Sequence, residues 1–337
     1  MPDNGKKPDI VYFQRKPRNV GNYSVEFIFE DVRYRLKDLI IAKIRFSRYE
    51  STGLFKRLYN CIEAAAGQGS VNHVTGDINY LGLLMNKHKT IHTILDCVFM
   101  TSTSGLKQAI LKLFWLSLPV KRSAYITAIS EATKKEIITH SGCDPEKIKV
   151  IYVAISNRFS RKDKPFNKSN PVILQVGTAF NKNIPRLIHA LNGLSCELHI
   201  VGKSNEEYER LLKENNITYR YQSGLTDAEI IAKYEEADIV SLVSTYEGFG
   251  MPILEAQAVG RPVITSSVFS MPEVAGDAAC IVDPFDVEQI RQGVNRILHD
   301  DDFRNSLVKK GFENIKRFDP EVIAMQYYEL YKKIRKS

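Results

Sequence analysis

Short apolar runs alternate with amphipathic segments along the second half of the chain. Residues 172–177 (VILQVG) are rich in β-branched residues and end at a glycine, which is typical of a buried strand. A segment with apolar positions at helical spacing follows, with Pro185 in its first turn and Gly193 near its end. The alternation predicts a parallel sheet covered by helices, as in a doubly wound, Rossmann-like domain. Its further strands are predicted over 196–202, 217–222, 238–244 and 262–266, and its helices over 183–194, 205–215, 226–237 and 251–260.

The first half repeats this alternation less regularly, with strands predicted over 9–14, 90–98 and 124–130 and a helix over 24–39. A polar, Pro-punctuated linker follows, and the chain ends in an amphipathic helix with Asp319 as N-cap and Pro320 at its first position. Because 337 residues are about twice a typical domain, we expect two Rossmann-like domains with a ligand-binding cleft. The expected boundaries are 1–155 for the first domain, 156–171 for the linker, 172–317 for the second domain and 318–337 for the terminal helix.

Composition places the chain among ordinary soluble globular proteins. It is 44% apolar and 26% charged, and no apolar run reaches the roughly 18 residues of a membrane span. The N-terminal residues lack the apolar core of a signal peptide. Five scattered cysteines without a C-x-x-C pair predict free thiols, and argue against a disulfide framework or a zinc site. We therefore expect a cytoplasmic protein.

Net charge is unevenly distributed along the chain. Residues 1–155 hold 23 basic and 14 acidic residues, a net +9, whereas the remainder has a net charge of −1. Segments 36–59 and 105–125 mix large apolar residues, Phe114 and Trp115 among them, with lysines and arginines. As basic amphipathic helices they predict peripheral attachment to the anionic inner face of the cell membrane; the alternative is buried helices with solvated lysines. No aromatic RNA-binding signature accompanies the charge, so no nucleic-acid partner is expected.

The stretch YEGFGMPILEA carries the strongest candidate chemistry. It places Glu247 at the end of a predicted strand and Glu255 about one turn into the following helix. The Gly-Phe-Gly turn between them leaves backbone amides near a helix start, which favours a phosphate. Two carboxylates around an anion site fit the ribose, diphosphate and hexose of a nucleotide sugar. The alternative is that Glu247 complements the helix dipole and Glu255 faces solvent.

This stretch resembles the E-x7-E motif of retaining glycosyltransferases of family four, which have the two-domain GT-B fold. Residues 129–138, 147–151, 175–191 and 271–286 are also similar to segments of that family, so the resemblance covers most of the chain. It implies an α/β protein of two Rossmann-like domains facing each other across a cleft, with the C-terminal helix returning to the N-terminal domain. A donor sugar nucleotide would bind the second domain and an acceptor the first.

The resemblance also implies residue roles. Glu247 would contact the donor hexose, Glu255 the ribose, and Lys182 would neutralise the diphosphate; the alternative for Lys182 is a solvated loop lysine. Glu247 and Lys182 would then be the catalytic residues, with no metal or other cofactor and a UDP- or GDP-hexose as donor. The implied donor site comprises Gly177, Thr178, Lys182, Ser223, Gly224, Glu247, Gly248, Phe249, Gly250, Met251, Leu254 and Glu255.

Several positions depart from the family pattern. Thr178 stands where the family often has an arginine, and Leu95 stands where it commonly has a histidine near the donor sugar. His92, three residues before Leu95, is interpreted as a structural strand residue. The aspartates at 300–302 imitate a metal-binding D-x-D motif, but their place between two predicted helices indicates a helix cap.

The expected acceptor-side residues follow strands of the first domain. Strand-end His and Asp side chains can face a ligand, although Asp and Gly are also common turn formers. The family's glycine-rich acceptor loop is reduced here to a single glycine. The acceptor-side prediction comprises Gly21, His73, Asp77 and Asp96.

Together these patterns predict a retaining hexosyltransferase that uses a nucleotide sugar and acts on a glycan acceptor. The basic first domain favours a lipid-linked acceptor, as in capsule, O-antigen or lipopolysaccharide assembly. Two alternatives stay open. One is a GT-B nucleotide-sugar epimerase, and the other is a non-catalytic, sugar-nucleotide-binding partner subunit, which the departures at Thr178 and Leu95 motivate.

Overall fold

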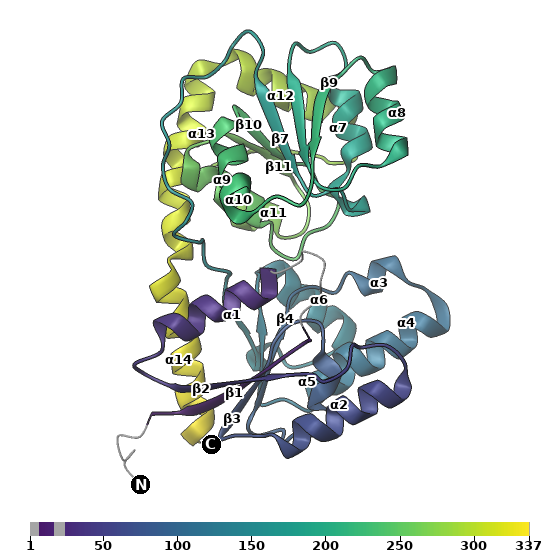
Figure 1. The fold of residues 1–337 in the computed structure, drawn as a ribbon, viewed down its shortest axis with the longest axis vertical. Coiled ribbons are helices and arrows are strands. Elements are labelled where there is room, and N and C mark those ends of the chain that lie inside the picture. Colours follow the sequence, from purple (N-terminus) through teal and green to yellow (C-terminus); the bar gives the residue numbers. More distant parts are fainter. Residues whose placement is uncertain (1–6, 17–23, 337) are drawn as a thin grey trace. The chain divides into compact units, whose positions relative to one another are not determined.

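The computed structural model describes residues 7–16 and 24–336, and the chain divides into two compact units (Figure 1). The first unit comprises the residues up to Ala154 together with those from Pro320 onward. The second unit is Ile155–Asp319. The division groups the expected linker with the second unit and the terminal helix with the first.

The first unit is built on a six-stranded parallel sheet in the order β2-β1-β3-β4-β5-β6. Its strands are β1 (Asp9–Gln14), β2 (Ile41–Phe46), β3 (Val71–Val74), β4 (Thr90–Ile94), β5 (Tyr125–Ala128) and β6 (Ile148–Val150). Its helices are α1 (Ser24–Arg35), α2 (Leu54–Ala66), α3 (Phe99–Ser102), α4 (Gly105–Leu111), α5 (Leu118–Lys121), α6 (Glu131–Ser141) and α14 (Pro320–Lys336). Shorter turns are η1 (Asn79–Leu84), the π-helical η2 (Lys112–Ser117) and η3 (Pro145–Lys147).

The segment 36–59 is not the single basic helix that its composition predicted. Its central part is β2, which pairs in register with β1 from Ile41 opposite Asp9 to Phe46 opposite Gln14. β2 lies at the sheet edge and all six of its residues are exposed. Pairing with β1 satisfies the backbone groups on one side of β2, and this long-range interaction cannot be read from the local charge pattern.

Helix α14 packs within the first unit although the 165 residues of the second unit separate it from the rest of the first unit's chain, as the fold prediction required. Its Tyr331 hydroxyl lies 2.8 Å from Nδ1 of His73 on β3, and Tyr327 packs edge-on against Phe29 of α1. Arg35, at the end of α1, pairs with Glu321. A buried aromatic and polar cluster therefore fastens the terminal helix to the first sheet.

The second unit has the strand order β12-β11-β10-β7-β8-β9, which is that of a doubly wound Rossmann sheet. Its strands are β7 (Val172–Val176), β8 (Glu197–Val201), β9 (Thr218–Gln222), β10 (Ile239–Leu242), β11 (Val263–Ser266) and β12 (Cys280–Val282). Its helices are α7 (Ile184–Leu191), α8 (Glu206–Glu214), α9 (Asp227–Glu236), α10 (Met251–Val259), α11 (Met271–Ala275), α12 (Val287–His299) and α13 (Asp301–Asn314), with the 3-10 turns η4 (Phe180–Lys182) and η5 (Ile315–Phe318).

Local sequence explains where these helices begin. Thr226 and Glu229 form a reciprocal capping box at the start of α9. Asp300 caps α13 by accepting from the amide of Phe303, so the interpretation of the 300–302 aspartates as a helix cap is confirmed. Proline occupies the first turn of α7 and of α10, where its missing N–H costs no hydrogen bond.

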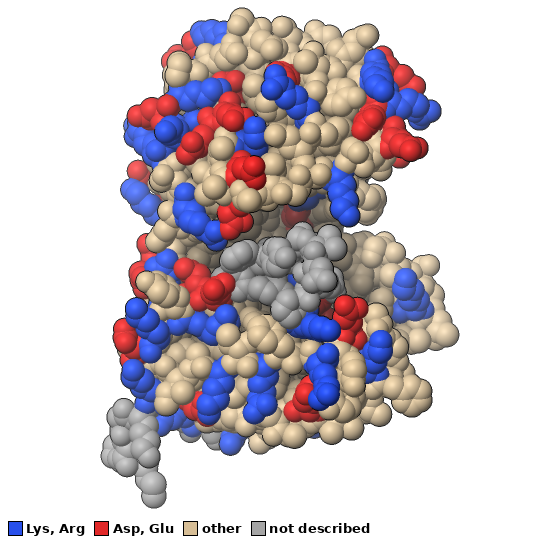
Figure 2. Space-filling view, viewed as in Figure 1, with Lys and Arg blue, Asp and Glu red and all other residues tan. Residues whose placement is uncertain are grey.

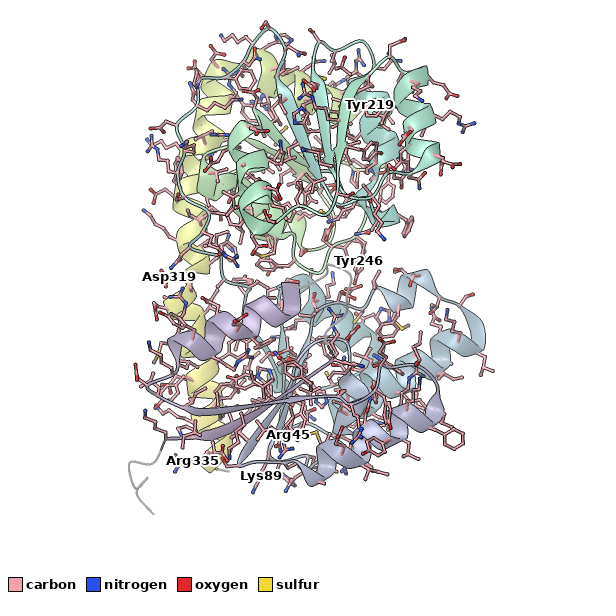
Figure 3. All side chains as sticks on the ribbon, viewed as in Figure 1. Arg45, Lys89, Tyr219, Tyr246, Asp319 and Arg335 are labelled. Atoms are coloured by element: carbon pink, nitrogen blue, oxygen red, sulfur yellow. The ribbon has the colours of Figure 1, made fainter. Side chains whose placement is uncertain are left out.

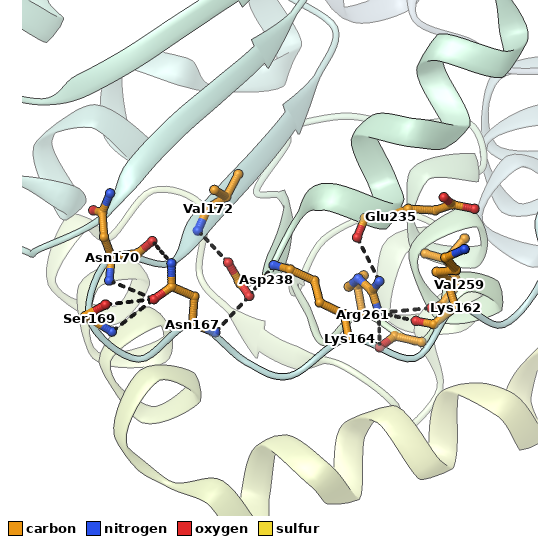
Figure 4. Close-up of polar contacts among 11 residues, drawn as sticks. Lys162, Lys164, Asn167, Ser169, Asn170, Val172, Glu235, Asp238, Val259 and Arg261 are labelled. Atoms are coloured by element: carbon orange, nitrogen blue, oxygen red, sulfur yellow. Dashed lines mark hydrogen bonds and ion pairs between the residues drawn. The ribbon is translucent and has the colours of Figure 1, made fainter.

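Residues 156–171 form no helix or strand, but polar contacts hold them against the second unit (Figure 4). The buried Asp238 carboxylate accepts from the Lys164 ammonium and from the amides of Asn167 and Val172. The buried Arg261 guanidinium donates to the carbonyl of Lys162 at 2.9 Å. Buried charges with this many partners tie the expected linker firmly to the amino ends of β7 and β10.

Candidate functional site

In the second sheet β7 and β10 lie side by side and run parallel, and the strand order reverses between them: β8 and β9 continue on one side, and β11 and β12 on the other. Loops that leave the carboxyl ends of two such strands diverge, and ligands of open α/β sheets bind in the crevice between them. The loop after β7 carries Lys182, and the loop after β10 carries Glu247. Figure 3 labels Tyr246 in the latter loop and Tyr219 near the other end of the sheet, on β9.

The loop after β7 folds so that Lys182 crosses over its first residue. Gly177 has φ +89°, in the left-handed region that favours glycine, and a Cβ there would lie 2.8 Å from Lys182 Cε. Asn183 is also left-handed, at φ 59°, and its buried amide donates to the carbonyls of Val243 and Pro284. These features fix the lysine against the end of β10.

Lys182 and Glu247 form an ion pair across the two loops. Nζ lies 2.6 Å from Oε1, and the side chains are 16% and 15% exposed. Ser244 Oγ donates to the same oxygen at 2.8 Å, and the Asn181 amide approaches it at 3.4 Å. Charge-assisted hydrogen bonds in this partly desolvated setting hold the carboxylate in one orientation. Both predicted catalytic side chains thus meet at the switch point of the sheet.

Helix α10 begins directly after the Gly-Phe-Gly turn. Gly250 is its N-cap at φ +104°, and no side chain caps this helix start. Ser270 Oγ donates to the carbonyls of Glu247 and Phe249 at 2.8 Å each, and the buried Phe249 ring packs edge-on against Phe318. The turn, which includes Gly248, is therefore anchored, while the helix start keeps the partial positive charge that attracts anions.

Glu255 lies one turn into α10 and is half-buried. The hydroxyl of Tyr234, on α9, donates to its Oε2. Burial raises the pKa of the Glu255 carboxyl, although the Tyr234 hydrogen bond and the positive charge of Lys182 act in the opposite direction. The side chain of Leu254 is fully buried in the core, and its assignment to the donor site stays a prediction. Met251 remains half-buried at the first helical position.

The remaining predicted donor residues lie along the same edge of the sheet. Thr178 packs against Gly202, directly after β8. A Cβ added to Gly202 would lie 2.6 Å from the Thr178 methyl carbon. Ser223 and Gly224 form an exposed turn after β9, and Gly224 has φ +71° with open space around it. Within residues 7–16 and 24–336, no three His, Cys, Asp or Glu side chains gather closely enough to hold a metal ion.

The first unit places the predicted acceptor residues in different surroundings. Gly21 lies outside the described residues. His73 is fully buried, with its ring nitrogens 2.8 Å from the Tyr331 and Thr93 hydroxyl oxygens, and burial lowers its pKa to about 3. Its prediction is therefore corrected: the ring belongs to the core, because α14 covers the end of β3.

The two predicted aspartates remain near the carboxyl ends of their strands. Asp77, after β3, pairs with Arg15 at 3.4 Å, and Asp96, after β4, accepts from the amide of Val98 at 3.0 Å. His92 is buried, with Nδ1 2.6 Å from Ser123 Oγ and Nε2 3.0 Å from the Asn79 carbonyl. This confirms the interpretation of His92 as a structural residue.

Sequence reasoning missed four residues that shape the site: Asn181, Ser244, Ser270 and Tyr234. Asn181 and Ser244 are close in sequence to Lys182 and Glu247, and their polarity in the loops that follow β7 and β10 could have drawn attention to them. Tyr234 sits in an amphipathic helix and looks like any core aromatic. Only the fold shows that its hydroxyl meets Glu255.

Residues 156–314 match the family described as Glycosyl transferases group 1. An MMP alpha-(1->4)-mannosyltransferase of Mycolicibacterium hassiacum is 27% identical over 223 residues, which cover 62% of this chain and 54% of that protein. O-antigen chain mannosyltransferase B of Escherichia coli is 39% identical over 113 residues, which cover 34% of this chain and 30% of that protein. The matched part of this chain thus spans about half the length of these relatives or less.

A solved structure supports the architecture. HepE of Anabaena, in complex with UDP and glucose, superimposes with a TM-score of 0.78 over 97% of this chain and 100% of that chain, at 16% identity. At 16% identity this similarity shows the fold alone. The chain therefore has the GT-B fold, with two Rossmann-like units of six parallel strands each.

Proposed function

We propose that this chain, whose residues 156–314 match the glycosyl transferases group 1 family, is a retaining hexosyltransferase. It would transfer a hexose from a nucleotide diphosphate sugar to a glycan acceptor. The observation that carries the proposal is the meeting of Lys182, Glu247 and the uncapped start of α10, with Glu255 one turn further on. The mannosyltransferases among its relatives favour a role in cell-surface polysaccharide or lipopolysaccharide assembly.

The proposed diphosphate site consists of Lys182 and the amides at the start of α10. When the hexose leaves the nucleotide, the departing diphosphate gains negative charge, and positioned positive groups stabilise this charge in the transition state. Lys182 supplies a full charge and the helix a partial one. Thr178, where the family often has an arginine, adds a hydroxyl without charge.

On either side of the diphosphate, a carboxylate would bind a hydroxyl-rich group. Glu255 would accept hydrogen bonds from the ribose, and Glu247 from the hexose, beside its anomeric carbon. Lys182, Ser244 and Asn181 already hold Glu247 in place before any ligand arrives. Because Glu247 is already oriented, its side chain needs no reorganisation free energy during the reaction.

For the transfer step we propose a front-face displacement. The bond between the hexose C1 and the diphosphate oxygen breaks, and the acceptor oxygen bonds to C1 from the same face. The acceptor proton passes to the departing phosphate oxygen. A double displacement would need a second carboxylate about 5 Å from the first to act as acid and base, whereas the hydrogen bonds to Glu247 Oε1 come from Lys182, Asn181 and Ser244.

A panel of UDP-, GDP- and dTDP-sugars tests the proposal. The preferred donor should raise the unfolding temperature by mass action. Product analysis with that donor then separates the candidates: a new glycosidic linkage supports the transferase, an altered free sugar nucleotide supports an epimerase, and binding with neither supports a partner subunit. No stabilisation by any sugar nucleotide would contradict all three.

Activity with the preferred donor should survive EDTA. Lys182 and the helix start supply the positive field that a divalent cation provides in other nucleotide-sugar enzymes. The measurement is donor turnover, including hydrolysis by water, before and after chelation. Complete inhibition that Mg²⁺ or Mn²⁺ reverses would contradict metal independence.

We also propose that the first unit attaches peripherally to the anionic inner face of the cell membrane, which would place a lipid-linked acceptor within reach. Two helical faces expose large apolar side chains. On α2 they are Leu54, Phe55, Leu58 and Ile62, and on α4 and η2 they are Leu106, Ile110, Leu113 and Phe114; we call these eight residues the apolar stripe. Figure 2 shows lysine and arginine side chains over the same unit.

The membrane prediction also changes at Trp115. Trp115 does not join the apolar stripe, because its ring packs against Tyr80 and its Nε1 donates to the Asp77 carbonyl at 2.8 Å. Arg57 of α2 lies 4.7 Å from the Trp115 ring centre, which brings α2 beside η2. Every helix in the described parts of the chain is too short or too polar to cross a bilayer.

A further inference from the structure

We infer that Tyr234 is a positioning residue that orients Glu255 toward the ribose of the bound nucleotide. The inference rests on the proposed function, in which Glu255 binds that ribose. It assigns a role to a residue outside the E-x7-E stretch, on the neighbouring helix α9. Tyr234 acts through Glu255 and would not itself contact the ligand, because its side chain is fully buried.

The contact between the two side chains has a fixed direction. The Tyr234 hydroxyl donates to Glu255 Oε2. Burial and the neighbouring Glu255 carboxylate raise the pKa of Tyr234 well above its ordinary value, so the hydroxyl keeps its proton. A phenol that stays protonated is always available as a donor to the carboxylate. Tyr234 therefore holds Oε2, and Oε1, for which the described residues show no partner, is left to accept from ribose hydroxyls.

The Tyr234 ring is itself held in place. Phe159, in the segment that joins the two units, packs edge-on against it with ring centres 5.5 Å apart and an interplanar angle of 89°. Arg158 pairs with Asp227 at the start of α9, next to the capping box of that helix. With the ring enclosed and only two side-chain torsions to vary, the hydroxyl has one position to occupy. A group so constrained can fix the rotamer of its partner.

Glu255 needs the hydrogen bond from Tyr234 because its carboxylate is half-buried on α10. Without the Tyr234 bond, the half-buried carboxylate would lose a hydrogen bond to its charged form and could turn between rotamers. A hydrogen bond to a charged group contributes more than a neutral one. A purely structural tyrosine would behave differently: its loss would loosen α9 and α10 and weaken every ligand of the site alike.

Calorimetry with four nucleotides separates the two roles. Tyr234→Phe keeps the ring and removes only the hydroxyl. We expect this variant to bind UDP and GDP on the order of 10-fold more weakly, and to bind 2′,3′-dideoxy-UDP and 2′,3′-dideoxy-GDP as the parent does. Adding Tyr234→Phe to Glu255→Ala should cause no further loss, because the tyrosine would act only through the glutamate.

Tyr219→Phe is the matched control, since Tyr219 lies near the amino end of β9, away from the site, and should leave all four affinities unchanged. Equal losses for the ribo and dideoxy nucleotides, or no loss at all, would overturn the inference while the parent's preference for ribose stands. A parent protein that binds both kinds of nucleotide equally would overturn the ribose assignment of Glu255 and this inference with it. Failure to bind any of the four, together with no stabilisation by any sugar nucleotide of the donor panel, would overturn the proposed function as well.

Discussion

Glu247 and Glu255 bracket one helix start, yet their surroundings differ. Glu247 is paired with Lys182, whereas Glu255 accepts from a neutral tyrosine and its pKa is raised by burial. These contacts suggest separate tasks, one at the reacting sugar and one at the nucleotide. The division can be tested with ligands that contain only part of the donor.

We expect Glu255→Ala to weaken the binding of bare UDP or GDP about 10-fold, because a charged hydrogen-bond acceptor for the ribose is lost. Glu247→Ala should leave nucleotide affinity nearly unchanged and lower turnover, since this residue would face the hexose. Calorimetry of both variants with UDP and GDP, followed by turnover of the preferred donor, measures the two effects. Equal losses of nucleotide affinity would contradict the division.

Among the elements, α14 depends on a buried histidine of β3 for part of its attachment. Burial, with smaller contributions from His92 and Arg33, lowers the pKa of His73 to about 3, against an ordinary value near 6.5. As the pH falls below 6.5, the unfolded chain takes up a proton that the folded chain refuses until about pH 3. The contribution of His73 to the free energy of unfolding is therefore present at neutral pH and lost on acidification. At pH 5 the loss is about 2 kcal/mol.

His73→Gln should remove this share of the acid sensitivity. The free energy of unfolding, measured with denaturant at pH 7 and pH 5, should fall less in the variant than in the parent, by about 2 kcal/mol. The variant will be less stable at neutral pH, because buried hydrogen bonds to Tyr331 and Thr93 are altered. His88→Gln, at an exposed position, is the control and should keep the parent's pH dependence. An unchanged difference in the His73 variant would contradict the assignment.

The apolar stripe on α2, α4 and η2 can be mutated to test whether these helices bind a membrane surface. Phe55 is 87% exposed and Leu106 is 78% exposed, so both can enter a lipid surface without rearrangement. Burying such a side chain contributes about 1.5–3 kcal/mol, and the double variant Phe55→Ser, Leu106→Ser should bind phosphatidylglycerol vesicles at least 10-fold more weakly. Phe285→Ser, at a 57% exposed position in the second unit, should bind as the parent does. Loss in the control, or none in the double variant, would contradict the stripe's role.

At the scale of the whole molecule, the uneven charge predicts how binding responds to salt. Residues 1–155 carry a net charge of +9, and the net charge of −1 on the rest of the chain is too small to balance it. Each basic residue near an anionic surface contributes about 1 kcal/mol, and the attraction is screened beyond about 10 Å at 0.1 M salt. Sedimentation with phosphatidylglycerol vesicles should therefore show binding at low salt that falls steeply as salt rises. Equal binding to phosphatidylcholine vesicles would show that charge plays no part.

Much of the fold could be predicted because its causes are local. The strand and helix pattern of residues 172–266 follows from apolar spacing, and the ends of α7, α9 and α13 follow from Pro185, Thr226 and Asp300. The position of Glu247 and Glu255 around a helix start also lies within a single stretch of chain. Such features depend on neighbours a few residues away, and the sequence alone contains them.

The tertiary structure decided everything that depends on distant partners. Segment 36–59 became an edge strand and a separate helix because β1 was available to pair with it. His73 became a core residue because α14 returns over β3. Lys182 and Glu247 meet, and Tyr234 meets Glu255, only because the sheet order brings β7 beside β10 and α9 beside α10. Contacts between residues far apart in the chain arise from packing, and no local pattern of apolar and polar positions encodes them.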